Sequence, residues 1–154
     1  MLQDELTVLE LLIRQEVAVK RLYEAFAIMF QEHEEFWTNI ANEEQYHADM
    51  LIKLRSRKDM ENWLVDEMKL LPETLKKSIA YADDKRKLAL KGEVNPQQAF
   101  SLAENIERFL VDGVFIKLEQ KNLTNTPMAL ITLANETRKH VELVLEKQRI
   151  LFRK

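Results

Sequence analysis

The sequence predicts an all-α fold, a four-helix bundle of two antiparallel helix pairs joined by a long helical crossover. The first supporting observation is composition, because 154 residues include only two glycines and three prolines, and helix-favouring residues abound. The second is periodicity, since apolar residues recur at alternating steps of about three and four along the helix-length segments. The third is a middle stretch, about 58–94, long enough to travel the length of a bundle.

Length and charge limit the classes of function. The chain fits one domain, 1–154, with a sizeable core. Charged residues make up 32% but nearly cancel to a net charge of -3, so we expect no binding to nucleic acid or membrane. The absence of cysteine excludes disulfides, thiolate catalysis and cysteine-ligated metal centres. No secretory signal follows Met1, and charges interrupt every long apolar stretch, so we expect a soluble, cytoplasmic protein.

The first two helices should form an antiparallel pair. Apolar periodicity predicts one helix over about 4–30 and another over about 35–57. The polar turn between them, 31–34, is short, and helices joined by a short connection pack as antiparallel neighbours. The crossover that follows is expected to contain an amphipathic stretch from Trp63 that stops near Pro72. A further helix is then predicted over about 73–91.

Capping signals mark the remaining helix ends. Gly92 can end the crossover helix, because glycine readily adopts the left-handed conformation found after a helix. Asn95 is a good N-cap, Pro96 suits the first helical position, and Gln98 stands where a capping-box partner belongs. The third main helix should continue to about residue 122. Thr126-Pro127 repeats the start signal for a last helix that runs nearly to the end of the chain.

Each main helix carries a metal-binding type of side chain within its apolar stripe. The stripes read Leu9, Leu12, Glu16, Val19, Tyr23, Phe26, Phe30; Trp37, Ile40, Glu44, His47, Leu51, Leu54; Phe100, Ala103, Glu107, Leu110, Val114; and Leu130, Leu133, Thr137, His140, Val144. An amphipathic helix directs such a stripe at its neighbours, so three carboxylates and two imidazoles should face one core. Ionised carboxylates need compensation there, and a bound metal would supply it.

Taken singly, most of these residues have simpler interpretations. Glu16 and Glu107 are each more typical of a buried carboxylate paired with a basic side chain, and His140 of a hydrogen-bonded core histidine. Glu44 and His47 are three residues apart and therefore share one helix face, whereas Glu43 lies off the stripe and is expected to be solvated. Together, the shared inward register of these residues favours a metal site.

These motifs resemble the ferritin-like superfamily and, within it, the rubrerythrin-related di-iron proteins. The resemblance covers the four main helices, and its carriers are Glu16 with Tyr23, Phe36-Trp37, Glu43-Glu44-Gln45-Tyr46-His47-Ala48, Glu104-Asn105-Ile106-Glu107, and Thr137 with His140. Such sites use a single Glu from each of two helices and Glu-x-x-His from the other two. The resemblance implies that Glu16, Glu44 and His47 hold a first ion. Glu107 and His140 would then hold a second ion, with Glu44 bridging.

The last helix departs from this pattern. Thr137 stands three residues before His140, where the family pattern expects Glu, and the adjacent Glu136 points about 100° away around the helix. A missing carboxylate predicts a weaker second site, a single-metal site, or a site that no longer cycles between oxidation states. Glu104, one turn before Glu107, is a candidate substitute ligand, because two Glu residues on the third helix also occur in some rubrerythrin-type sites.

Three functions stay open at this level. The mixed carboxylate and imidazole ligand set suits two iron ions, with manganese or zinc as further candidates. The resemblance implies an oxidoreductase acting on dioxygen, peroxide or ferrous iron, with an external electron donor because the cysteines of a rubredoxin-like module are absent. The alternatives are a non-catalytic metal-binding protein in iron handling or sensing, and a degenerate bundle with a structural role. We also expect a homodimer, because helix bundles often self-associate through an apolar face.

Overall fold

The computed structural model describes residues 7–57, 71–120 and 127–152, and every regular element in these ranges is helical. The elements in chain order are α1 (Val8–Met29), a short 3₁₀ turn (Gln31–His33), α2 (Glu34–Arg55), α3 (Leu71–Leu90), α4 (Pro96–Leu110), a π-helical segment (Val111–Phe115), α5 (Ile116–Gln120) and α6 (Met128–Phe152). The predicted all-α class is therefore confirmed. The amphipathic stretch at Trp63 and the cap at Thr126 lie outside the described residues.

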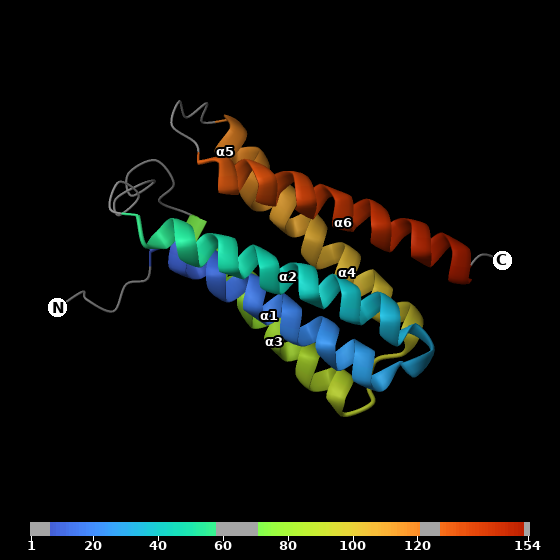
Figure 1. The fold of residues 1–154 in the computed structure, drawn as a ribbon. Helices are drawn as coiled ribbons and strands as arrows, with labels where there is room; N and C mark the ends of the chain where they lie inside the picture. The colour runs from blue at the N-terminus through green and yellow to red at the C-terminus, as the bar shows by residue number, and fades with distance from the viewer. Residues whose placement is uncertain (1–6, 58–70, 121–126, 153–154) are drawn as a thin grey trace.

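The helices lie roughly along one common axis (Figure 1). α1 and α2 run in opposite directions side by side, and α4 and α6 form a second antiparallel pair. α3 packs against α1 on the side away from α6 and also contacts α4. α2 and α4 point the same way, so the chain between them returns along the bundle through α3 (Figure 1).

Capping groups explain where several helices begin and end. The Thr7 hydroxyl accepts a hydrogen bond from the Glu10 backbone N–H at 3.1 Å, so α1 begins at Val8 rather than near residue 4. Asn95 and Gln98 form the predicted capping box, with reciprocal bonds of 2.8 and 2.9 Å. Gly92 has a φ of 78°, which confirms its role after the end of α3.

Two features differ from the sequence-based expectation. Where the described residues resume, α3 already includes Leu71 and Pro72, so the chain is helical at Pro72 and not only from residue 73. The third main helix is not regular to residue 122, because a π-helical turn, Val111–Phe115, separates α4 from α5. The wider turn changes the register, and both Val114 and the adjacent Phe115 are buried.

The apolar core consists of two clusters with a polar layer between them. One cluster contains Leu12 of α1 and Leu51 of α2, together with Leu110 and Leu133. The other contains residues from the opposite half of each helix, such as Val19 and Ile40. The buried polar residues of the four stripes fall between these positions in sequence, so they occupy the middle of the bundle.

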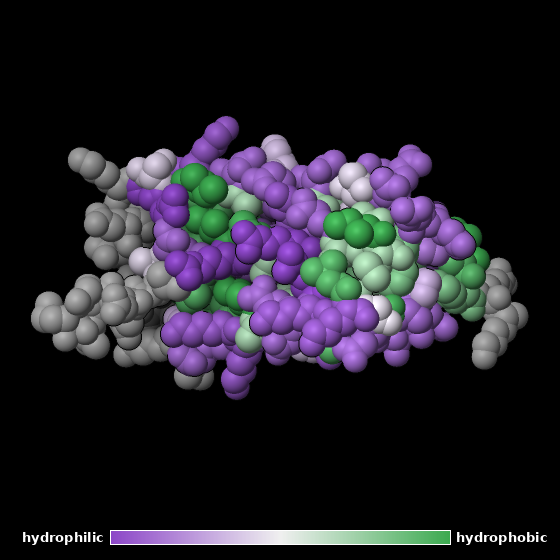
Figure 2. Space-filling model, turned by 90° about the horizontal axis from the view of Figure 1, so that it is seen from below, coloured by the Kyte–Doolittle hydropathy of each residue, from purple (hydrophilic) through white to green (hydrophobic). Residues whose placement is uncertain are grey.

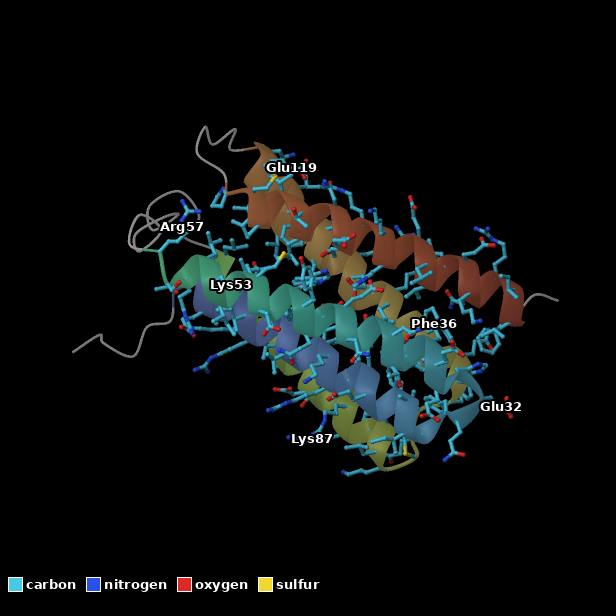
Figure 3. The ribbon with its side chains drawn as sticks, viewed as in Figure 1. Glu32, Phe36, Lys53, Arg57, Lys87 and Glu119 are labelled. Atoms are coloured by element: carbon cyan, nitrogen blue, oxygen red, sulfur yellow. The ribbon has the colours of Figure 1, made fainter. Side chains whose placement is uncertain are left out.

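The outer surface is mainly polar. On the face shown in Figure 2, bands of hydrophilic side chains separate the apolar patches. Charged side chains such as Lys87 and Glu119 project outward from their helices (Figure 3). Within the ranges that the structure describes, no helix combines the length and apolar character that a membrane span requires.

Candidate metal centre

A layer of buried polar side chains crosses the middle of the bundle. Each member is at most 2% exposed, and the members are Glu16 from α1, Glu44 and His47 from α2, Glu107 from α4, and Thr137 and His140 from α6. Each residue continues the apolar register of its own helix, so ordinary helix packing directs all of them inward. We call this set the polar layer.

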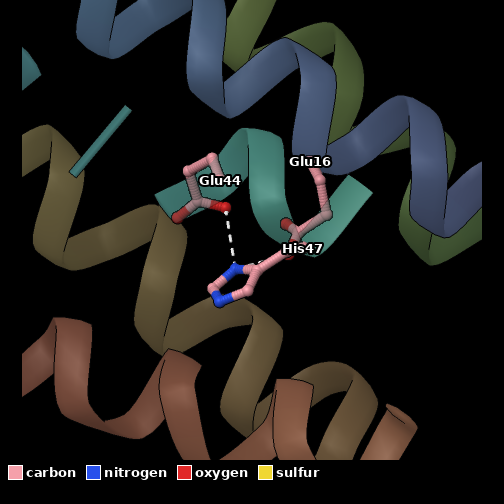
Figure 4. A group of neighbouring side chains, drawn as sticks. All are labelled: Glu16, Glu44 and His47. Carbon is pink, nitrogen blue, oxygen red and sulfur yellow. Dashed lines mark ion pairs between the residues drawn. The ribbon is translucent and has the colours of Figure 1, made fainter. Parts of the chain in front are cut away.

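The first group of possible ligands in the polar layer joins α1 to α2. His47 Nδ1 lies 3.3 Å from Glu16 Oε1 and 3.5 Å from Glu44 Oε2. Figure 4 shows the three side chains converging from the two helices. We call Glu16, Glu44 and His47 the first half-site; their ligand atoms all lie within 4.8 Å of one another.

The second group joins α2, α4 and α6. His140 Nδ1 lies 3.0 Å from Glu44 Oε1 and 3.5 Å from Glu107 Oε1. We call Glu44, Glu107 and His140 the second half-site, and their ligand atoms also lie within 4.8 Å of one another. The centroids of the rings of His47 and His140 are 5.4 Å apart, so the two half-sites are adjacent.

Glu44 connects the two half-sites through its separate oxygens. Oε2 faces His47, whereas Oε1 faces His140. A carboxylate placed in this way can ligate one ion with each oxygen. This is the geometry that a bridging ligand between two neighbouring cations requires.

Burial and mutual charge determine the proton content of the metal-free layer. Burial and the nearby Glu44 carboxylate raise the pKa of Glu16 to about 8, and the same two causes raise the pKa of Glu107 to about 7. Burial also disfavours the Glu44 anion, yet the hydrogen bond between Glu44 and His140 and the nearby His47 ring outweigh this effect and lower the pKa of Glu44 to about 2. Burial opposes charge on both histidines, but their carboxylate neighbours raise the pKa of His47 to about 10 and that of His140 to about 12.

Two ligand atoms of the first half-site are buried without a hydrogen-bond partner among the described residues. They are Glu16 Oε1 and His47 Nδ1. Buried polar atoms are nearly always hydrogen-bonded, and a cation between these two atoms would satisfy both. The set of carboxylate oxygens and imidazole nitrogens fits iron, manganese or zinc. The residues present therefore fit a metal centre.

Tyr23 and Thr137 border the half-sites in different ways. The Tyr23 hydroxyl donates a hydrogen bond of 2.8 Å to Glu107 Oε1, so it orients that carboxylate from another helix. The centroid of its ring lies 5.3 Å from that of the Trp37 ring, which agrees with a role in core packing. The Thr137 hydroxyl donates to the Leu133 carbonyl oxygen at 2.8 Å, within its own helix, and offers no carboxylate to the second half-site.

The structure brings together five of the six residues predicted as ligands, all except Glu104. The carboxylate of Glu104 instead accepts a hydrogen bond of 2.8 Å from Arg108 Nε, and lies outside both half-sites. Glu136 pairs with Lys139 at 3.5 Å and does not replace the missing carboxylate.

Sequence reasoning missed two further residues beside the polar layer. The Glu43 side chain is 52% exposed, as an off-stripe position predicts, yet its Oε1 lies 2.7 Å from His140 Nε2. Gln15, next to Glu16, is fully buried, and neither of its side-chain polar atoms has a partner within the described part of the chain. Neither residue belongs to the stripe pattern from which ligands were predicted.

The chain matches no protein-family model, no curated protein and no solved structure. The geometry of the two half-sites and the resemblance of the sequence motifs are therefore the basis for assigning a function.

Proposed function

We propose that this chain binds two metal ions, with iron as the best fit, and acts as a rubrerythrin-like oxidoreductase on dioxygen, peroxide or ferrous iron. The observation that carries the proposal is that one buried carboxylate, Glu44, belongs to both ligand groups. The first ion would bind to Glu16, Glu44 and His47, and the second to Glu44, Glu107 and His140. When bound, a pair of irons supplies one-electron chemistry at each ion, and an external donor would restore the electrons.

We further propose that the fold is of the ferritin-like type. The α1–α2 and α4–α6 pairs support this arrangement, because α2 and α4 run in the same direction as a long crossover requires (Figure 1). In this arrangement each of the four helices contributes a residue to the polar layer. The core position of the layer is also the usual place for metal sites in such bundles.

Within this proposal, residues of the chain exclude water, orient a ligand and hold protons. The two apolar clusters on either side of the polar layer exclude water from the bound ions. Tyr23 fixes the orientation of the Glu107 carboxylate through its hydrogen bond of 2.8 Å. The histidines and Glu16 hold protons in the metal-free protein and would release them when ions bind.

A second candidate function is metal binding without catalysis, in iron handling or sensing. Thr137 favours it, because the family pattern expects a further carboxylate at this position, and without it the polar layer has less negative charge to hold a second cation. A third candidate is a degenerate bundle in which the polar layer is only a hydrogen-bonded core. The homodimer is also a proposal, and light scattering would test it.

Metal analysis of protein purified without chelator distinguishes the three functions. Two irons per chain and a ferric absorption band that appears and disappears with peroxide and reductant would support the oxidoreductase. Stable binding without redox change would support the second candidate. An absence of binding, with an unchanged melting temperature on addition of ferrous iron, would contradict both and leave the structural role.

Restoring a carboxylate at position 137 should strengthen the second half-site. We expect Thr137→Glu to tighten binding of the second ion by at least about tenfold, or about 1.4 kcal/mol, because it adds a buried negative ligand. Calorimetric titration with ferrous iron under anaerobic conditions measures this effect. Asn135→Glu adds the same charge at an exposed position of α6 and is the matched control. Equal effects of the two substitutions would contradict direct ligation from position 137.

A further inference from the structure

The two nitrogens of His140 face different carboxylates. Nδ1 points into the second half-site, at 3.0 Å from Glu44 Oε1 and 3.5 Å from Glu107 Oε1. Nε2 points away from it, at 2.7 Å from Glu43 Oε1. Glu43 belongs to α2 and His140 to α6, so this contact also joins two helices.

This geometry restricts how His140 can bind a metal. A ligating nitrogen must carry no proton, so the other nitrogen of a neutral imidazole carries the N–H. With Nδ1 directed at the half-site, Nε2–H would donate to Glu43. A carboxylate in that place fixes the tautomer and the ring orientation, and it makes the ligating nitrogen more basic.

The two half-sites differ in whether an outer carboxylate contacts the histidine. His47 Nδ1 faces Glu16 and Glu44, and no outer carboxylate contacts its Nε2 among the residues that the structure describes. Among the described residues, only the histidine of the second half-site has such a partner, and this histidine follows Thr137 by one helical turn. Both half-sites supply two carboxylates and one imidazole, so the outer carboxylate is an addition to the half-site that shares α6 with position 137, where the family pattern expects a further Glu.

We propose that Glu43 is a positioning residue that selectively strengthens metal binding at the second half-site by holding the Nδ1-ligating form of His140. This inference rests on the proposed function, because it requires ions at both half-sites. Glu43 does not ligate the ion itself, since it contacts the ring from the side opposite Nδ1. Its contact with His140 offsets part of the metal affinity that the second half-site lacks because position 137 is Thr and not Glu.

Titration with Zn²⁺, a redox-silent probe, tests the inference. Glu43→Ala should weaken binding of the second Zn²⁺ by about 10–100-fold and leave the first unchanged, as expected for loss of an outer partner. Glu43→Gln, which keeps an acceptor but loses the charge, should fall between Glu43→Ala and the wild type, and Glu43→Asp should recover most of the affinity. Glu35→Ala removes another exposed glutamate of α2 and should have no effect.

NMR of the Zn²⁺-loaded protein labelled with ¹⁵N-histidine gives a second readout, and only three histidines contribute. The wild type should show His140 as the Nε2–H tautomer, and Glu43→Ala should give a mixed or rapidly exchanging signal. Two Zn²⁺ ions bound equally well by Glu43→Ala and Glu35→Ala would overturn the role of Glu43 alone. Equal weakening of both ions would also overturn it. Failure of the wild type to bind Zn²⁺ would instead contradict the metal centre itself.

Discussion

Replacing Glu44 should abolish high-affinity binding of both ions. Glu44→Gln keeps the shape of the side chain but removes the negative charge from both half-sites, because its two oxygens face His47 and His140. We expect affinity to fall by more than about 100-fold at each half-site, since even the loss of an outer partner costs about 10–100-fold. Equilibrium dialysis followed by metal analysis measures the number of ions bound.

Substitutions at the outer members of the two half-sites provide the controls for this experiment. Glu16→Gln should remove only the first ion and Glu107→Gln only the second, because each residue belongs to one group. Glu43→Ala should have a smaller effect than Glu44→Gln, because Glu43 contacts a ligand from outside the layer. Binding of two ions by folded Glu44→Gln, with an unchanged helical circular dichroism spectrum, would contradict a bridging role.

The inward register of the polar layer was predictable because it depends on helix periodicity alone. Glu44 and His47 continue the spacing of Ile40 and Leu51, and all four residues are buried. Helix ends such as Asn95 were predictable for a similar reason, since caps use backbone groups a few residues away. In both cases the residues that determine the feature lie within about one or two helical turns of each other.

Features that depend on how helices are placed against one another were not predictable. The contact between Glu43 and His140 requires a particular offset of α2 along α6, which no local pattern specifies. Gln15 is buried because α1 packs against α3 as well as α2, and Leu11 and Leu22 are buried with it. A single inward stripe therefore underestimates how much of α1 is covered. The π-helical turn at 111–115 also lacks a distinctive periodicity.

The stability of the metal-free protein should fall as the pH rises from about 5 to 9. The folded-state pKa values of Glu16 and Glu107 are raised above 4.5, and those of His47 and His140 are raised above 6.5. The folded chain therefore binds more protons than the unfolded chain over this range, and stability decreases with pH. The lowered pKa of Glu44 has the opposite effect, but only as the pH falls from about 4.5 toward 2. Thermal unfolding across this pH range, with chelator present, measures the trend.

Metal binding should show the opposite dependence on pH, because the ions displace the protons held by the polar layer. At pH 7 we expect release of about three protons as two ions bind, one from each histidine, most of one from Glu16 and part of one from Glu107. Each half-site loses at least one proton, so its affinity should rise by at least about tenfold per pH unit between about pH 6 and 7. Calorimetry in buffers of different ionisation enthalpy counts the protons. Binding without proton release would show that the ions do not reach these side chains.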